Sequence, residues 1–228
     1  MKNISQPKIS VVVPIYNTPE KYLKNNLQHL KKQTLNQIEV ILIDDGSESK
    51  TAKICDYYVE QNKNFRVIHK KNAGLSAAKN TGVKESSGEY ILFIDGDDFV
   101  EYDAYAQLYP EREKPDVVCA CMSKNMNGKI KEYDYSLFRD GKIYKNSECK
   151  FFRDNVLNFY ANISSANGKL FKKSFLLKSK EDIGRLNLLL KINKYRKLIL
   201  FCIKRKLFLF IYLLSTIRYL QKYKFHKI

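Results

Sequence analysis

The sequence predicts an α/β fold with a mostly parallel sheet flanked by helices. Short, continuous apolar runs rich in Val and Ile alternate with amphipathic helical stretches between Lys8 and Phe99. Strands that are buried on both faces of a parallel sheet have such continuous apolar sequences, and the regular alternation of strand and helix is typical of an open parallel sheet. A polar segment follows each apolar run, at the place where sheets of this kind bind ligands.

Four strands and three helices are predicted in this first part of the chain. The first strand occupies residues 9–13 and is expected to end at Pro14, because proline cannot donate to a strand ladder. Thr18 is expected to cap a helix that begins at Pro19 and extends to about residue 33. Its apolar stripe is formed by Leu23, Leu27 and Leu30. The remaining expected elements are strands at 38–43, 65–69 and 90–94 and helices at 51–61 and 75–85.

Beyond Phe99 the pattern is less regular. A fifth strand is expected at 116–122, a hairpin insertion at 128–144, a helix at 147–158, and a turn with an edge strand at 163–173. The length suits one α/β domain with a short appendage. We therefore assign one domain to residues 8–182 and a basic, apolar, helical tail to residues 183–228.

Positive charge is concentrated in this tail. The formal net charge of the chain is +17, and residues 185–228 contain twelve Lys or Arg and no Asp or Glu, which leaves +5 for the rest. A body of nearly ordinary charge lacks the continuous basic face of a nucleic-acid-binding protein. Nucleic acid is therefore not an expected partner.

The tail is instead predicted to contact a membrane surface. Its apolar runs at 198–203 and 207–217 are separated by Lys204, Arg205 and Lys206. Three cations at the centre of a spanning helix would cost about 7–10 kcal/mol, so an interfacial helix on an anionic leaflet is favoured. The alternative is a helix that packs on the domain or on a partner.

Cysteine usage bears on the compartment. The five cysteines form no C-x-x-C pair, which is typical of a reducing environment. The first apolar run is too short for the core of a secretory signal. The expected location is cytoplasmic and peripheral, at the inner face of the cell membrane.

Three clustered carboxylates indicate a metal site. Asp95, Asp97 and Asp98 follow the apolar run at 90–94, and Gly96 permits a tight turn between them. Oxygen ligands suit Mg²⁺ or Mn²⁺, which such sites commonly share with a substrate phosphate. The alternative is an acidic surface turn after a core strand.

Four segments together resemble the motifs of the family 2 glycosyltransferases, which have the Rossmann-like GT-A fold. They are VVPIYN at 12–17, DDGS at 44–47, NAGLSAAKNTG at 72–82 and DGDD at 95–98, in the order and at the separations of the family. The resemblance is strong over residues 8–100, the expected nucleotide-sugar-binding half. It is looser over residues 101–175. Residues 101–182 would form a shortened acceptor half.

The resemblance implies a nucleotide-sugar donor, with a UDP-sugar favoured, and Mn²⁺ or Mg²⁺ as cofactor. The ion would be held by Asp95, Asp97 and Asp98. In the family Asp44 would accept a hydrogen bond from a uracil-like N–H, although the segment at 45–47 also suits a helix cap. The residues expected to bind the donor are Pro14, Tyr16, Asn17, Asp44, Asp45, Asn72, Gly74, Lys79, Asp95 and Asp97.

The catalytic base is harder to assign. The family's reaction inverts the anomeric centre, and one carboxylate takes the proton of the acceptor hydroxyl. Glu181 and Asp182 form the only acidic pair late in the chain. They are candidates for this base, or alternatively they form the acidic first turn of the tail helix.

These observations predict an inverting, metal-dependent glycosyltransferase. Its acceptor would be a hydroxyl of a cell-surface polysaccharide, lipopolysaccharide or lipid-linked glycan. One alternative is a truncated or degenerate family member that binds nucleotide without turnover. A second alternative is a non-enzymatic membrane or nucleic-acid binding module.

Overall fold

The structure is a computed structural model that describes residues 6–112, 114–119, 123–126, 129–132 and 166–178. The helix expected at 147–158 and the tail expected at 183–228 lie outside these residues. Within the described part of the chain, every helix is too short or too polar to cross a bilayer.

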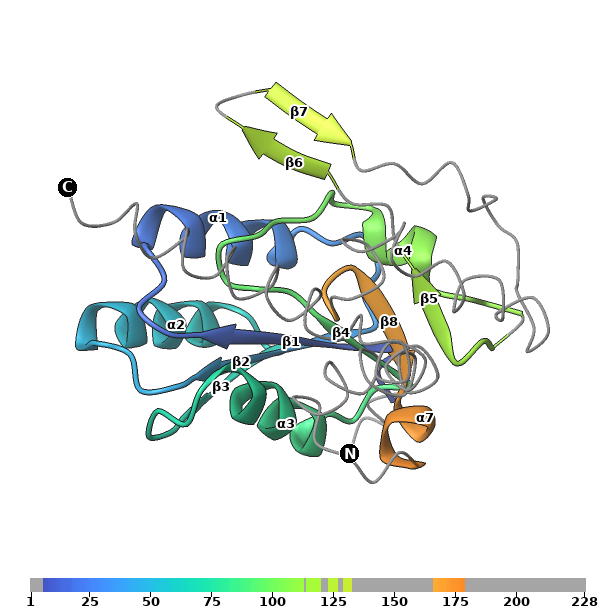
Figure 1. Cartoon of the computed structure of the whole chain (residues 1–228), viewed down its shortest axis with the longest axis horizontal. Coiled ribbons are helices and arrows are strands. Elements are labelled where there is room, and N and C mark those ends of the chain that lie inside the picture. Colours follow the sequence, from blue (N-terminus) through green and yellow to red (C-terminus); the bar gives the residue numbers. More distant parts are fainter. Residues whose placement is uncertain (1–5, 113, 120–122, 127–128, 133–165, 179–228) are drawn as a thin grey trace, which may run out of the picture.

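A six-stranded sheet forms the centre of the domain (Figure 1). The four strands that come first in sequence are mutually parallel and lie in the order β3-β2-β1-β4. β8 then runs antiparallel to β4, and β5 runs antiparallel to β8. The α/β class and the mostly parallel sheet are thereby confirmed. The strands are β1 (Ile9–Ile15), β2 (Ile38–Asp44), β3 (Phe65–His69), β4 (Tyr90–Phe93), β5 (Val117–Cys119) and β8 (Lys169–Lys172), and a separate ribbon pairs β6 (Ser123–Met126) with β7 (Lys129–Glu132).

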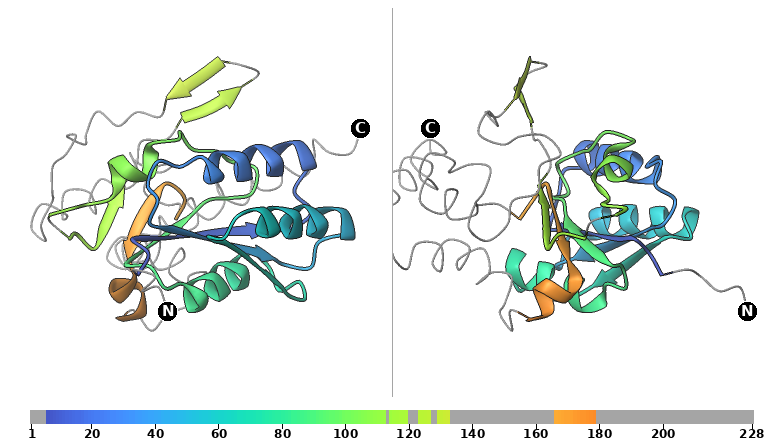
Figure 2. Two further views of the ribbon diagram at one scale, coloured as in Figure 1. Left: turned by 180° about the vertical axis from the view of Figure 1, so that it is seen from behind. Right: turned by 90° about the vertical axis from the view of Figure 1, so that its right-hand side faces the viewer.

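Helices cover both faces of this sheet (Figures 1 and 2). One face carries α1 (Glu20–Lys31), α2 (Ser49–Gln61) and α4 (Ala104–Leu108), and the other carries α3 (Leu75–Glu85) and α7 (Lys173–Lys178). Val11 and Val13 of β1 pack in the core cluster that includes α1 and α2, whereas Val12 packs in the cluster that includes α3. This burial on both faces is the reason for the continuous apolar sequences of the strands.

The first strand extends further than predicted. β1 continues through Pro14 to Ile15, and Pro14 pairs with Ile43 of β2. On its other side β1 pairs with β4 only as far as Val12 and Phe93. The pairing with β4 thus ends where Pro14, which has no N–H to donate, would have to continue it.

The predicted starts of two helices were also wrong. α1 begins at Glu20, and the cap position is occupied by Pro19, whose carbonyl accepts hydrogen bonds from the N–H groups of Tyr22 and Leu23. Thr18 therefore does not cap this helix. α2 begins at Ser49, earlier than expected, and among the described residues no side chain makes a capping hydrogen bond there. The segment at 45–47 is consequently free to serve the loops described below.

The position of β8 corrects another prediction. The sequence predicted an edge strand at 163–173, but β8 lies inside the sheet between β4 and β5. The ribbon of β6 and β7 begins at Ser123, ahead of the insertion predicted at 128–144. β8 thus brings the second half of the chain directly against the strand that precedes the carboxylate cluster.

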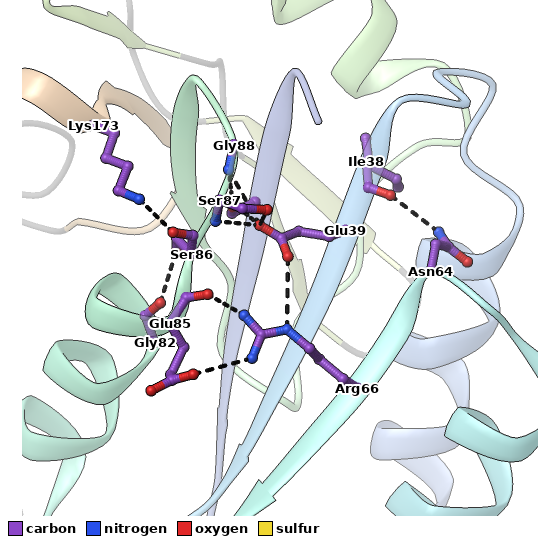
Figure 3. Close-up of polar contacts among 11 residues, drawn as sticks. Ile38, Glu39, Asn64, Arg66, Gly82, Glu85, Ser86, Ser87, Gly88 and Lys173 are labelled. Atoms are coloured by element: carbon purple, nitrogen blue, oxygen red, sulfur yellow. Dashed lines mark hydrogen bonds and ion pairs between the residues drawn. The ribbon is translucent and has the colours of Figure 1, made fainter. Parts of the chain in front are cut away.

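The amino ends of the parallel strands are joined by a polar network (Figure 3). The Glu39 carboxylate accepts hydrogen bonds from the Ser10 hydroxyl and from the N–H groups of Ser87 and Gly88, and it pairs with Arg66 at 3.6 Å. Burial acts to raise the pKa of Glu39, but the hydrogen bonds from Ser10 and Ser87 and the charge of Arg66 outweigh it and lower that pKa. This network joins the strands at their amino ends, which lie opposite the candidate site.

Candidate functional site

The candidate site lies at the carboxyl ends of the parallel strands, which all meet on one side of the sheet. β2 and β3 follow on one side of β1, whereas β4 lies on the other side. The chain therefore reverses its direction of sheet growth between β1 and β4, and ligands of open α/β sheets bind at such a switch point. The loops after all four parallel strands begin at this edge, as the sequence predicted.

The first two loops are joined through Asn17. Its N–H donates to the Ser47 hydroxyl at 3.1 Å, and its Oδ1 accepts from the Glu48 N–H at 2.8 Å. Asn17 has a positive φ of 48°, a conformation that Asn tolerates better than most residues. Tyr16 beside it is 57% exposed, which leaves its ring available at the rim.

Asp44 lies at the end of β2 with its side chain only 4% exposed. Its Oδ1 accepts from the Ser47 N–H at 2.9 Å, and its Oδ2 lies 2.7 Å from Nδ1 of His69. The other nitrogen of His69 lies 3.0 Å from Asp56 Oδ1. Both oxygens of Asp44 are thus engaged by the protein, and its contact with a base stays a prediction.

The charges of this pair support each other. The hydrogen bonds to Asp44 and then Asp56 raise the pKa of His69, because carboxylates can only accept and so favour the doubly protonated imidazolium. Burial acts to raise the pKa of Asp44, but hydrogen bonds from Ser47 and His69 outweigh it and lower that pKa. His69 therefore links β2, β3 and α2, and these contacts favour its protonated form.

A pH-dependent contribution to stability follows. The raised pKa of His69 contributes stability that is present below its unfolded-state pKa and is lost as pH rises through the folded value. The lowered pKa of Asp44 contributes stability that is lost as pH falls through its folded value. The two contributions overlap between about pH 4 and pH 6.5.

We expect His69→Gln to lower the thermal midpoint more near pH 5.5 than near pH 8.5. These two values lie roughly one pH unit below and roughly two above the ordinary pKa of histidine. Asp56→Asn, which keeps the contact between His69 and Asp44, should show a smaller dependence on pH. An equal loss for His69→Gln at both pH values would contradict this account.

Asp45 joins the second loop to the third. Its carboxylate pairs with Lys70 and accepts hydrogen bonds from the N–H groups of Ala73 (3.1 Å) and Gly74 (2.8 Å). Gly46 has a φ of +79°, and a Cβ there would lie 2.8 Å from the backbone nitrogen of Asn72. The second and third loops therefore touch, and Asn72 and Gly74 stay exposed at the rim.

The carboxylate loop after β4 is held from three directions. Asn26, a buried residue of α1, donates from Nδ2 to the carbonyl oxygens of Asp95 (3.2 Å) and Asp98 (2.6 Å). Lys79 of α3 is also buried, and its Nζ lies 3.3 Å from Asp95 Oδ1. Asn167, which precedes β8, donates from Nδ2 to Asp95 Oδ2 at 2.6 Å. Asp97 and Asp98 are exposed.

The electrostatics of this loop suit a cation. Desolvation and then repulsion from Asp95 and Asp97 raise the pKa of Asp98 to about 6, although part of its side chain reaches the surface. Asp95 Oδ1 is buried and accepts no hydrogen bond from any described residue. No group of three His, Cys, Asp or Glu among the described residues is arranged to hold an ion alone. A cation here would therefore complete its shell with water and substrate oxygens.

Sequence reasoning predicted the four loops that the structure brings together here, but it missed several residues that hold them. The four loops with Pro14, Tyr16, Asp44, Asp45 and the carboxylates are brought to one edge. Asn26 was missed, although a polar residue within a leucine stripe was a usable signal. Asn167 was treated only as part of a turn. The base candidates Glu181 and Asp182 lie outside the described residues.

The sheet order and the loops at its carboxyl edge define an open α/β domain of the GT-A type. The chain belongs to glycosyl transferase family 2, whose sequence profile matches residues 10–177. It is 42% identical over 137 residues to glycosyltransferase GlyG of Streptococcus pneumoniae, and this match covers 60% of this chain and 42% of that protein. It is 33% identical over 185 residues to glycosyltransferase GlyA of the same species, which covers 78% of this chain and 26% of that protein.

A solved structure supports the same fold. TarS residues 1–349 of S. aureus, in complex with UDP-GlcNAc, match with a TM-score of 0.59 and 27% identity, over 76% of this chain and 47% of that one. In each of these comparisons the chain spans less than half of the relative's length.

Proposed function

We propose that this chain is an inverting, metal-dependent glycosyltransferase that uses a nucleotide-diphosphate sugar, with a UDP-sugar as the first candidate. The observation that carries the proposal is the carboxylate loop, which three separate elements hold at the switch point of the sheet. The likeness to TarS, whose structure contains UDP-GlcNAc, supports the choice of donor. The expectation of Mn²⁺ or Mg²⁺ is supported by the oxygen-only donor set.

The described residues divide the work of binding. Asp97 and Asp98 are the exposed carboxylates and would hold the ion, while Asp95 is anchored by Lys79 and Asn167. A bound divalent ion would neutralise the negative charge that develops on the departing diphosphate. Tyr16 and Asn72 lie exposed at the rim of the neighbouring loops, where they would border the base and ribose.

The acceptor and the location are proposed from the sequence. We assign the acceptor to the hydroxyl groups of a cell-surface or lipid-linked glycan, with Asp182 or Glu181 as base. The basic tail would place the chain at a membrane surface. Partitioning onto anionic vesicles, with and without residues 185–228, tests that location, and unchanged partitioning after the deletion would exclude it.

The donor site is tested by calorimetric titration of UDP with and without Mn²⁺. We expect the full chain to bind UDP in the presence of Mn²⁺ and Asp97→Asn to lose this binding. Residues that only support metal ligands contribute about 10–100-fold in affinity, so loss of a direct ligand should cost at least about a hundredfold. Asp103→Asn, at an exposed position before α4, is the matched control and should bind like the parent chain.

Two outcomes would overturn the assignment. UDP binding that does not depend on Mn²⁺ would remove the metal from the donor site. A chain that binds neither UDP nor GDP with Mn²⁺ would not be a functional donor-binding domain. Binding without transfer to any acceptor would instead favour the alternative of a family member without turnover.

A further inference from the structure

A residue from the second half of the chain reaches the carboxylate loop. Asn167 lies in a turn before β8, where Gly168 has a φ of +68°. It forms a bridge with Phe93, the last residue of β4. Since Phe93 precedes the loop at 95–98, this pairing places the Asn167 side chain beside Asp95, which lies 72 positions earlier in the sequence.

The Asn167 amide bridges two opposite charges. Its Nδ2 donates to Asp95 Oδ2 at 2.6 Å, and its Oδ1 accepts from Lys79 Nζ at 3.1 Å. Lys79 Nζ also lies 3.3 Å from Asp95 Oδ1. Asn167, Lys79 and Asp95 therefore all contact one another. The residue is 8% exposed, and Lys79 is 4% exposed.

The chemistry of this position favours an amide. A side-chain amide presents a donor and an acceptor together, so it can satisfy a carboxylate and an ammonium at once. A carboxylate at 167 would accept from Lys79 but would repel Asp95. An apolar side chain would leave the buried Lys79 ammonium and the part-buried Asp95 carboxylate without this partner, which is costly where water is excluded.

We propose that Asn167 is a positioning residue of the donor site. By bridging Lys79 and Asp95 it keeps the Asp95 carboxylate turned into the protein, so that Asp97 and Asp98 face the bound cation and diphosphate. This inference rests on the proposed function for its ligand and on the contacts of Asn167 for its geometry. It also makes β8 and the turn before it part of the donor site.

The test uses two variants that break different bonds. Asn167→Leu removes both contacts, whereas Asn167→Asp keeps an acceptor for Lys79 and replaces the donor to Asp95 by a negative charge. Asn64→Leu is the control, because Asn64 also precedes a strand and donates to a backbone carbonyl, at the opposite edge of the sheet (Figure 3). The reporter is the Asp98 N–H, which donates to the Asp95 carbonyl at 3.0 Å and closes the loop.

Three measurements are made on each full-length chain. They are the NMR hydrogen exchange of the Asp98 amide, titration with Mn²⁺ alone, and the thermal midpoint. We expect both Asn167 variants to exchange the Asp98 amide about tenfold faster or more, and Asn167→Leu to lose about 10–100-fold in Mn²⁺ affinity. Mg²⁺, which is diamagnetic and leaves the Asp98 signal visible, should slow the exchange of Asn167→Asp again, because the ion offsets the added charge, but not that of Asn167→Leu.

The outcomes separate this inference from the proposed function. If the parent chain binds no Mn²⁺, the proposed function fails, and the exchange of the Asp98 amide still decides whether Asn167 positions the loop. Exchange in Asn167→Leu equal to that of the parent chain would overturn the inference. An equal acceleration in Asn64→Leu would also overturn it, because the effect would then reflect general destabilisation.

Discussion

Gly82→Ala is expected to destabilise the fold by about 2 kcal/mol. A Cβ at this position of α3 would lie 2.2 Å from Val12 Cγ1 and 2.9 Å from Val12 Cγ2. Overpacking of this kind typically costs about 1–3 kcal/mol, and the short distance places Gly82 at the upper end. The better helix propensity of alanine returns at most about 1 kcal/mol. The steric term therefore decides the sign.

The packing around Val12 prevents its side chain from moving away from an added Cβ. Its side chain is fully buried, and its backbone pairs with both Ile41 of β2 and Phe93 of β4. α3 would have to move away from the sheet, and with it Lys79 and the start of the helix beside the site. Chemical denaturation followed by circular dichroism measures the loss.

A double-mutant cycle with Val12→Ala gives the control. Removing the two Cγ atoms relieves the closest contacts, so Gly82→Ala combined with Val12→Ala should be more stable than the sum of the single changes predicts. Contacting residues typically couple by about 0.5–3 kcal/mol. Strict additivity, or a Gly82→Ala variant as stable as the parent, would refute the steric explanation.

Gly82 also shows what the sequence could and could not explain. It lies in the segment at 72–82 that carries part of the resemblance. The need for a glycine at this position, however, becomes clear only from the packing of α3 on β1. The strands themselves were predictable, because burial on both faces leaves a continuous apolar run. The loops at their carboxyl ends were predictable too, because parallel strands all end at the same edge.

Features that depend on distant partners could not be derived in this way. Pro14 lies within β1 because it pairs with Ile43 of β2, at the level where the pairing with β4 ends. β8 is internal because β5 pairs on its outer side. Asn167 meets Asp95 through that sheet order, and no local pattern encodes a contact between residues so far apart. The role of Asn26 was easier to predict, since its burial among Leu23, Leu27 and Leu30 requires polar partners on the facing loop.

Asp45→Asn is expected to have the largest effect on the candidate site. The parent carboxylate serves three donors, namely the Lys70 ammonium and the N–H groups of Ala73 and Gly74. An asparagine has one oxygen and one NH₂ group, so one orientation sets NH₂ against Lys70 and the other sets it against the Gly74 N–H. Each orientation leaves donors facing each other in a site where the Asp45 side chain is 4% exposed.

The energetic loss follows from the burial of the pair. Removing one partner of a buried ion pair costs about 3–5 kcal/mol. Lys70 is 21% exposed and can turn toward water, so we expect the lower end, about 3 kcal/mol. The third loop and the start of α3 should loosen. Mn²⁺-dependent UDP affinity should then fall by at least about tenfold, because a tenfold loss of affinity corresponds to only about 1.4 kcal/mol, less than the expected loss of stability.

Combining Asp45→Asn with Lys70→Met tests the cause. Without the Lys70 ammonium, the asparagine can direct its NH₂ group toward the methionine side and its oxygen toward the Ala73 and Gly74 N–H groups. The double variant should therefore regain at least about 0.5 kcal/mol relative to Asp45→Asn alone. Urea denaturation measures this term without any ligand, so it stands even if UDP is not the nucleotide. A double variant that is less stable than Asp45→Asn would show that Lys70 supports the loops by other contacts, such as its hydrogen bond to the Lys71 carbonyl, and that the donor conflict is not what weakens the site.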